Sequence, residues 1–278
     1  MGIIDKAMIE KWVLPQLTVG TRGFETTVPL MEVVECIFHR LKTGCQWREL
    51  PTKQFFTDKV LGWNSVFYYY NNWSKADCWR TIWINILTQN RQHLDLSSVE
   101  FDGSHTPAKT GGDAVGYQGR KAANTTNALF LSDNQGVMLA MSTPQAGQHH
   151  DLFAIQELFD EICGLLKAAG IDLKGLFLNA DAGFDSADFR AACEAEEIIA
   201  NVKENPRNAE PSVYESGTHV FDDQLYTDRS VIEHANAWLD GFKALLVRFE
   251  FSIKNWMSLH FIAFSVIFLR KISRKKKV

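Results

Sequence analysis

Three acidic residues stand where carboxylates could bind a divalent cation. Asp102 closes the segment SVEFDGS at residues 98–104, and Asp181 lies just past the apolar segment GLFLN at residues 175–179. If these segments are adjacent strands of a mixed sheet, the two carboxylates emerge side by side, and hard divalent cations prefer such clusters of oxygen ligands. Glu233, near the start of a long predicted helix, can supply a third carboxylate over the same end of the sheet.

The chemistry of such a site is phosphoryl transfer. Two cations about 3.5 to 4 Å apart can activate a water or a 3'-hydroxyl and stabilise the entering and leaving oxygens of an in-line displacement at phosphorus. That reaction needs acids and metal, and no nucleophilic side chain. Taken alone, each acid has a simpler explanation, because an aspartate at a strand end commonly caps a turn and Glu233 can pair with Arg229 one turn earlier.

The elements around these acids predict a mixed sheet flanked by helices, in the order of a ribonuclease-H-like domain. Alternating apolar residues and turn signals predict the strands, and apolar residues at helical spacing predict the helices. The expected strands cover residues 98–104, 126–131, 137–142, 175–179 and 198–202, and the expected helices cover 151–169, a stretch from about 186, and about 228–249.

The last of these helices has two distinct faces. Its predicted apolar stripe contains Val231, Ala235, Trp238, Phe242, Leu245 and Phe249. A separate polar stripe contains Arg229, Glu233, Asn236, Asp240 and Lys243.

The chain before about residue 95 is predicted to be entirely helical. Apolar residues recur at helical spacing over 30–41, where the pattern stops at Gly44, over 60–70, and over 79–87 behind the capping pair Ser74 and Asp77. Three short helices rich in Trp and Tyr could form a DNA reader of the helix-turn-helix type. An aromatic stripe at helical spacing is also typical of a plain core, and core positions are expected for Trp47 and Trp63.

Composition sets further limits. The 278 residues are 46% hydrophobic and 22% charged, which is typical of a globular protein, and the formal net charge is −4. Five scattered cysteines without a CxxC spacing indicate neither a zinc site nor a disulfide framework, and favour a reducing cytoplasm. The net charge argues against unspecialised nucleic-acid binding, but a basic tail over residues 270–277 partly offsets it.

Membrane and targeting segments are not expected. The longest apolar stretch, residues 256–269, is interrupted by polar residues and is shorter than the roughly 20 residues that cross a bilayer, so a buried helix is predicted. The first residues have no apolar signal core.

Weaker candidates surround the acids. His105 could contact DNA or water near Asp102, although a turn histidine without a further role is the commoner case. A metal site at His149, His150 and Asp151 is not favoured, because Asp151 is a natural N-cap of the following helix. Asp185 and Ser186 are expected to cap the helix after Asp181. Arg120 and Lys121, in a Gly-flanked loop, suit either a phosphate contact or a solvated turn.

Three segments resemble the acidic blocks of bacterial insertion-sequence DDE transposases, in particular the insertion-sequence-five group. They are FDGSH at residues 101–105, NADAGFDS at 179–186 and YTDRSVIE at 226–233. The most specific feature is the spacing of Tyr226, Arg229 and Glu233. Further similarity lies in CQWRELP at 45–51, GRK at 119–121, AWL at 237–239, and Phe242 with Lys243, so the resemblance runs over most of the chain.

The resemblance implies that Asp102, Asp181 and Glu233 bind two Mg²⁺ or Mn²⁺ ions, and that Tyr226 and Arg229 touch substrate phosphate. The family signature continues with a lysine seven residues after the glutamate, but this chain has Asp240 there. Lys243, one turn further along the same polar stripe, could serve the phosphate instead.

By the same resemblance, the chain is expected to be a cytoplasmic, nucleoid-associated transposase that binds terminal inverted repeats and target DNA as a homodimer or larger assembly. Two alternatives are an inactive transposase-derived DNA-binding protein and a ribonuclease-H-like nuclease that does not join strands. The expected division is a helical DNA-end-binding domain at 1–95, a catalytic domain at 96–255, and a C-terminal helix with a basic tail at 256–278.

Overall fold

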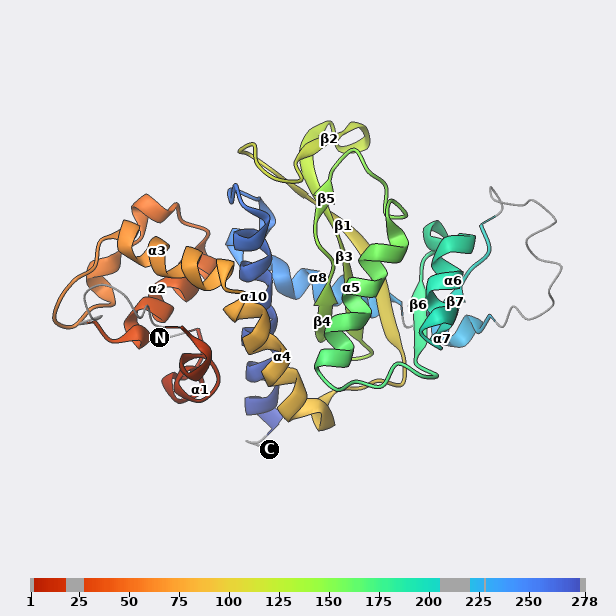
Figure 1. Ribbon diagram of the computed structural model, residues 1–278, viewed down its shortest axis with the longest axis horizontal. Coiled ribbons are helices and arrows are strands. Elements are labelled where there is room, and N and C mark those ends of the chain that lie inside the picture. The colour runs from red at the N-terminus through yellow and green to blue at the C-terminus, as the bar shows by residue number, and fades with distance from the viewer. Residues whose placement is uncertain (1–2, 19–27, 206–220, 228, 276–278) are drawn as a thin grey trace. The chain divides into compact units, whose positions relative to one another are not determined.

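The computed structural model describes residues 3–18, 28–205, 221–227 and 229–275 (Figure 1). Packing divides the chain into two compact units, each described here by itself. What we call the sheet unit comprises the described parts of 90–108 and 114–237, and what we call the helical unit comprises those of 1–89, 109–113 and 238–278.

The sheet unit is built on one mixed sheet with the strand order β2-β3-β1-β6-β7, in which β4 and β5 also pair with β3. β1 is antiparallel to β3 and parallel to β6, and β6 is parallel to β7. The strands are β1 Val99–Pro107, β2 Gly116–Gln118, β3 Ala123–Asp133, β4 Met138–Met141, β5 Gln145–Ala146, β6 Phe177–Ala180 and β7 Ile199–Val202.

Helices α5 and α6 supply the aromatic core on one face of this sheet (Figure 1). Phe101 of β1 is fully buried, stacks on Phe189 of α6 with ring centroids 5.2 Å apart, and meets Phe159 of α5 edge-on at 5.6 Å. Side chains alternate along a strand, so the neighbours of Phe101 face the opposite side of the sheet. The helices of this unit are η4 Arg91–His93, η5 Gly119–Lys121, α5 Ile155–Ala168, η6 Ala182–Phe184, α6 Ala187–Ala195, α7 Asp223–Thr227 and most of α8 Ser230–Asp240.

The helical unit is organised around its longest helix, α10. Trp83 of α4 packs edge-on against Phe264 and Phe268 of α10, at centroid distances of 5.8 and 5.9 Å. A buried ion pair joins Arg40 of α2 to Glu250, with 2.8 Å between nitrogen and oxygen. The elements are α1 Lys6–Trp12, η1 Leu14–Gln16, α2 Leu30–Thr43, η2 Trp47–Glu49, η3 Thr52–Gln54, α3 Trp63–Lys75, α4 Cys78–Asn90, α9 Lys243–Leu246 and α10 Ile253–Lys275.

Gly44 ends α2 as predicted, and its position requires glycine. Its φ is 68°, and a Cβ there would lie 2.9 Å from the carbonyl carbon of Lys243 in α9. A larger residue would therefore strain the turn and push α9 away from α2.

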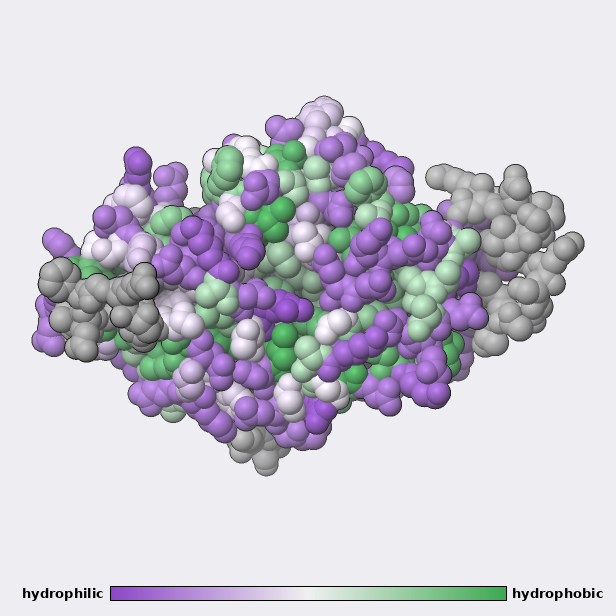
Figure 2. All heavy atoms as spheres, in the orientation of Figure 1, coloured by the Kyte–Doolittle hydropathy of each residue, from purple (hydrophilic) through white to green (hydrophobic). Residues whose placement is uncertain are grey.

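The apolar stretch at residues 256–269 is a buried helix, as predicted. Residues 253–274 of α10 are long and apolar enough to cross a membrane, but 72% of their most apolar window is buried inside the protein, as in the core helix of a globular fold. Among the described residues, Tyr68 and Phe251 are the large hydrophobic side chains with the greatest exposure. The face in Figure 2 shows small hydrophobic areas among hydrophilic ones.

The predicted fold class is confirmed, and most predicted strands and helices are present within a few residues. The continuous helix at 228–249 is wrong, because the chain breaks at Gly241 into α8 and α9. The buried side of α8 consists of Ile232, Ala235 and Leu239, whereas Trp238 is 45% exposed. The core prediction also fails for Trp63, which is 37% exposed and lies beneath the Arg48 guanidinium.

One strand boundary also differs from expectation. β1 does not end at Asp102, because its pairing with β3 continues to Pro107. The C-terminal helix α10 belongs to the same compact unit as the N-terminal helices. The expected domains at 1–95, 96–255 and 256–278 stay a prediction.

His260 of α10 should make the protein sensitive to mild acid. Its Nδ1 lies 3.1 Å from the Trp256 carbonyl oxygen, and burial lowers its pKa to about 4. The unfolded chain binds this proton near pH 6.5, so stability should fall as the pH drops from about 6.5 to about 4, by roughly 3 kcal/mol. Urea unfolding of His260→Phe should show a flatter pH dependence than the unsubstituted protein over this window. Equal slopes would contradict the assignment.

Candidate active site

The pairing of β1 with β6 places two of the three predicted acids side by side. The strands run parallel, with Glu100 opposite Asn179 and Phe101 opposite Ala180. One residue further, Asp102 continues β1 and Asp181 directly follows the last residue of β6. Asp181 leaves β6 into η6, where its carboxylate accepts a hydrogen bond from the Gly183 backbone N–H at 2.7 Å.

Asp102 is electrostatically unusual. Burial, together with the negative charges of Asp181 and Asp151, raises its pKa to about 6, against the lowering effects of the Gly103 backbone N–H and the Arg229 guanidinium. A cation placed between the two aspartates would relieve both the burial cost and the repulsion.

The turn between α7 and α8 brings Arg229 toward Asp102. The Arg229 guanidinium lies over the Tyr226 ring, 5.8 Å from its centroid, and its positive charge reaches the Asp102 carboxylate. Tyr226 in turn packs against Phe221 at 5.2 Å. Glu233 is exposed and lies one helical turn after Arg229 on α8.

The donor set fits a hard divalent cation, since it consists of carboxylate oxygens. Among the described residues, however, no three side chains of His, Cys, Asp or Glu are gathered closely enough to hold a metal ion. The structure therefore brings Asp102 and Asp181 together and leaves Glu233 outside that pair.

Asp151 was predicted to be the N-cap of the helix that follows it, and this is wrong. α5 begins at Ile155, and its N-cap is Ala154, in the left-handed region with φ 51°. Asp151 instead accepts a hydrogen bond of 2.7 Å from the Asn127 side-chain amide and lies over Gly103, where a Cβ would come within 2.3 Å of its Oδ1. Asp151 therefore lies on the face of the sheet that Gly103 and His105 share, opposite Asp102, and its negative charge acts on both Asp102 and His105.

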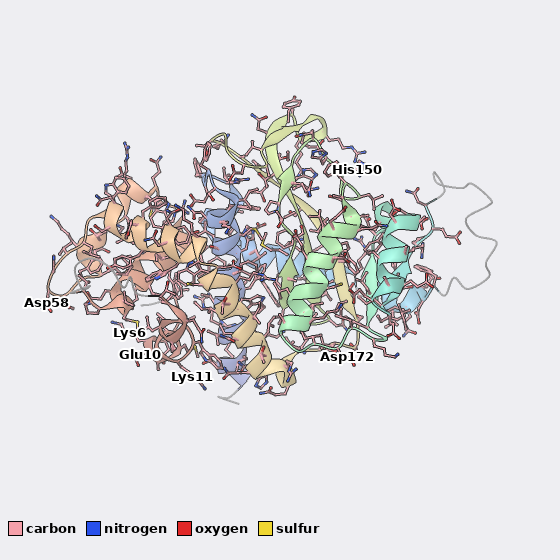
Figure 3. The ribbon with its side chains drawn as sticks, in the orientation of Figure 1. Lys6, Glu10, Lys11, Asp58, His150 and Asp172 are labelled. Carbon is pink, nitrogen blue, oxygen red and sulfur yellow. The ribbon has the colours of Figure 1, made fainter. Side chains whose placement is uncertain are left out.

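The histidines near these acids do not join them. His105 belongs to β1 and points to the face opposite Asp102, where its Nδ1 is 3.1 Å from the Thr125 hydroxyl. Figure 3 shows His150 near the N-terminal end of α5, exposed, with its Nδ1 accepting the Leu152 N–H at 3.2 Å. His149 stacks on Phe153.

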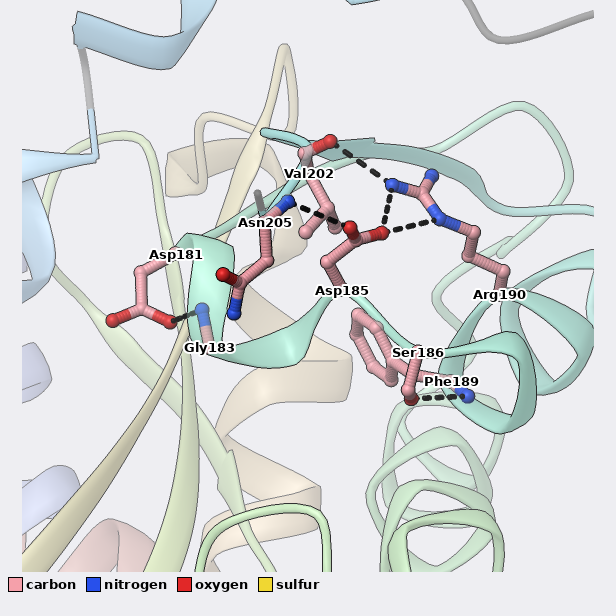
Figure 4. Close-up of polar contacts among 8 residues, drawn as sticks. All are labelled: Asp181, Gly183, Asp185, Ser186, Phe189, Arg190, Val202 and Asn205. Carbon is pink, nitrogen blue, oxygen red and sulfur yellow. Dashed lines mark hydrogen bonds and ion pairs between the residues drawn. The ribbon is translucent and has the colours of Figure 1, made fainter. Parts of the chain in front are cut away.

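The segment after Asp181 is held by a buried ion pair (Figure 4). Ser186 caps α6 as predicted, with its hydroxyl accepting the Phe189 N–H at 3.2 Å. The capping prediction for Asp185 is wrong, because its carboxylate binds the Arg190 guanidinium at 2.7 Å and accepts the Asn205 N–H at 2.8 Å. Asp185 therefore ties η6 to α6 and to the end of β7, which fixes the backbone that carries Asp181.

The predicted phosphate-binding bases lie in two different units. Arg120 and Lys121 are exposed in η5, between β2 and β3, and the Lys121 ammonium donates to the His105 carbonyl at 2.9 Å. Lys243 is exposed on α9, which packs with α2 in the helical unit. It does not continue the polar stripe of α8, because Gly241 interrupts the helix.

Comparison with known families agrees with this geometry. A model described as "DDE superfamily endonuclease" matches residues 98–267, which is more than half of the chain. The chain belongs to the DDE superfamily of endonucleases. A second model, described as "Putative transposase of IS4/5 family", matches residues 7–83, and the two matches together confirm the resemblance to insertion-sequence DDE transposases.

The fold is similar to that of a solved transposase of low sequence identity. The piggyBac transposase in its synaptic complex with hairpin DNA is 13% identical, with a TM-score of 0.51 over 98% of this chain and 73% of that one. The Mos1 transposase paired-end complex is 11% identical, with a TM-score of 0.30 over 92% of this chain and 82% of that one. No functionally curated protein matches the sequence significantly.

The raised pKa of Asp102 should affect how the free energy of unfolding of this DDE protein depends on pH when no metal is bound. Charging a carboxylate whose folded pKa is raised costs folding free energy, so the penalty should grow as the pH rises from about 4 to about 6 and then stay constant. In a chelator, Asp102→Asn should therefore be more stable than the unsubstituted protein at pH 7, by roughly 3 kcal/mol, and nearly equal to it at pH 4. Urea unfolding at both pH values measures this, and no gain at pH 7 would contradict the assignment.

Proposed function

We propose that the protein is an insertion-sequence transposase that binds the terminal inverted repeats of its element, cleaves the DNA at each end and joins the freed 3'-hydroxyls to a target. Asp102, Asp181 and Glu233 are its metal-binding residues in this proposal. The observation that supports it most is the placement of Asp102 and Asp181 directly after the last pair of the parallel strands β1 and β6, Phe101 and Ala180, in a DDE endonuclease domain.

Asp102 and Asp181 would hold two Mg²⁺ or Mn²⁺ ions, with Glu233 completing the site from α8. Such ions polarise the phosphate and stabilise the entering and leaving oxygens. The carboxylates orient the reacting groups, and Asp102 must be ionised for this role, which its Arg229 neighbour favours. Because Glu233 is not grouped with the aspartates, α8 has to approach them when metal and DNA bind.

Tyr226 and Arg229 are proposed to contact the phosphate next to the scissile bond. The Arg229 guanidinium already lies near Asp102, so a phosphate bound between them would place the scissile bond at the carboxylate pair. Arg120, Lys121 and Lys243 are proposed to contact the DNA backbone further away, and the helical N-terminal region is proposed to read the element end. The protein would act as a homodimer or larger assembly, since two DNA ends must be paired.

Two other functions are compatible with the same fold and acidic residues. A nuclease of the same fold would cut without joining, and an inactive descendant would bind ends without cutting. Structure and family similarity favour the active enzyme over a binding protein, because both aspartates of the sheet are in place.

Cleavage of a labelled duplex carrying the element end tests the proposal. With Mg²⁺ or Mn²⁺, the unsubstituted protein should cut and join, and Asp181→Asn should lose both activities by at least about a thousandfold, because its neutral amide cannot neutralise the cations. Asp188→Asn, which changes an exposed acid on α6, is the matched control and should keep full activity.

Cutting without joining would favour the nuclease, and end binding without metal-dependent cutting would favour the inactive descendant. Activity in Asp181→Asn equal to that of Asp188→Asn would refute the assignment of the site.

The basic loop at η5 has a separate test, because phosphate contacts release counterions. Replacing Arg120 and Lys121 together by alanine should weaken binding to any duplex and reduce the slope of log K against log salt concentration by up to about 2. Lys174→Ala, which removes an exposed lysine paired with Glu197, should leave the slope unchanged. Filter binding at four salt concentrations measures both, and equal slopes would place η5 outside the DNA contact.

A further inference from the structure

Three polar side chains form a hydrogen-bonded row across the three neighbouring strands β1, β6 and β7. Glu100, Asn179 and Asn201 lie directly opposite one another on β1, β6 and β7, and all three are fully buried. The Asn179 amide donates to the Glu100 carboxylate at 3.0 Å, and the Asn201 amide donates to the Asn179 side-chain oxygen at 2.8 Å. We call this set the polar row.

The polar row also binds the backbone that begins α7. The Asn179 amide donates its second hydrogen to the Leu225 carbonyl at 3.0 Å, and the Asn201 amide donates its second to the Asp222 carbonyl at 3.0 Å. The Asp222 N–H returns a hydrogen bond to the Asn201 side-chain oxygen at 2.9 Å. Each asparagine therefore donates one amide hydrogen within the polar row and the other to the backbone of the segment 222–225.

This segment leads directly to the proposed catalytic residues. Asp222 caps α7, since its Oδ1 accepts the Leu225 N–H at 3.0 Å. Backbone hydrogen bonds then run from the Arg229 N–H to Tyr226 and from the Ile232 N–H to Arg229, each 3.2 Å long. A displacement of the start of α7 would therefore be carried to Arg229 and on to the first turn of α8.

The polar row and the aspartate pair lie on the same face of the sheet. Glu100 stands two residues before Asp102, and Asn179 stands two residues before Asp181, and side chains two residues apart on a strand share a face. This face of the sheet therefore carries two successive sets of polar side chains. The polar row binds the start of α7, and two residues further along the strands lie the carboxylates of Asp102 and Asp181.

The folding free energy alone does not explain why three polar residues occupy these buried positions. Polar groups in a sheet core cost free energy unless every hydrogen bond is made, and apolar residues of similar size often serve at least as well. Here both amide hydrogens of each asparagine are donated in hydrogen bonds. Two of the acceptors are backbone carbonyls of the segment 222–225, so these bonds fix the position of that segment above the strands.

We propose that Glu100, Asn179 and Asn201 are positioning residues that anchor the start of α7 and so set where Arg229 and Glu233 lie relative to Asp102 and Asp181. The proposal rests on the proposed function for its catalytic consequence, but the anchoring itself is independent of it. Substitution should slow cleavage while leaving DNA-end binding intact, because the polar row is buried and reaches the DNA only through α7 and α8.

The test compares Asn201→Ala with Asn255→Ala. Asn255 is a buried asparagine of the helical unit whose amide donates to the Asn71 side chain at 3.1 Å, so its replacement removes a buried asparagine hydrogen bond without touching 222–225. Three quantities are measured: hydrogen exchange of peptides covering 221–227, the single-turnover rate of end cleavage with Mn²⁺, and the Kd for the same end duplex. Asn201→Ser, which keeps one hydrogen-bonding group, replaces the alanine variant if that does not fold.

In Asn201→Ala, exchange over 221–227 should accelerate, and cleavage should slow about 10- to 100-fold, the usual cost of losing a group that orients a metal ligand. The Kd should stay within about twofold, and Asn255→Ala should change neither exchange nor rate at a comparable loss of Tm. Unchanged exchange over 221–227, or equal slowing in both variants, would overturn the proposal. If the unsubstituted protein cut no element end, the proposed function would fail, and the exchange experiment alone would decide the anchoring.

Discussion

The parallel pairing of β1 with β6 is the constraint on which the rest of the site depends. It sets Phe101 opposite Ala180, and so brings the two following aspartates to adjacent positions. The aromatic core beneath it, where Phe101 packs against α5 and α6, holds that register, because a shift of β1 by one residue would turn Phe101 out of the core and Asp102 into it. Packing on one face of the sheet thus determines the electrostatics on the other.

The same arrangement is costly without a ligand. Asp102 lies half-buried next to Asp181, and its raised pKa records the burial and the repulsion by Asp181 and Asp151 that folding has to overcome. Proteins tolerate such strain where it serves binding, and a site that is unfavourable when empty gains more from a cation. The surrounding hydrogen bonds keep the acids in place despite this cost. Asp185 ties η6 to α6 and the end of β7, and the polar row ties the start of α7 to the strands.

Much of this could be predicted from the sequence, and the failures have physical causes. The short strands were visible because β-branched and apolar residues alternate between turn signals, and the acids were visible because they follow such strands. The break at Gly241 was missed because apolar residues continue at helical spacing through it into α9. The spacing before α5 predicts a cap at Asp151, because local spacing cannot show that Gly103 of β1, far away in the sequence, lies against this side chain. The sequence does indicate that Glu100, Asn179 and Asn201 are unusual, because each interrupts an otherwise apolar strand. Only the pairing of the strands shows that the three side chains meet.

The central claim is that the sheet presents Asp102 and Asp181 as one cation site that Glu233 completes. Anomalous diffraction from crystals of the protein grown with its element-end duplex and Mn²⁺ tests it most directly. The account predicts manganese peaks in contact with both aspartates, with α8 drawn in so that Glu233 reaches the metal. Manganese bound elsewhere, or bound to one aspartate without the other, would contradict it.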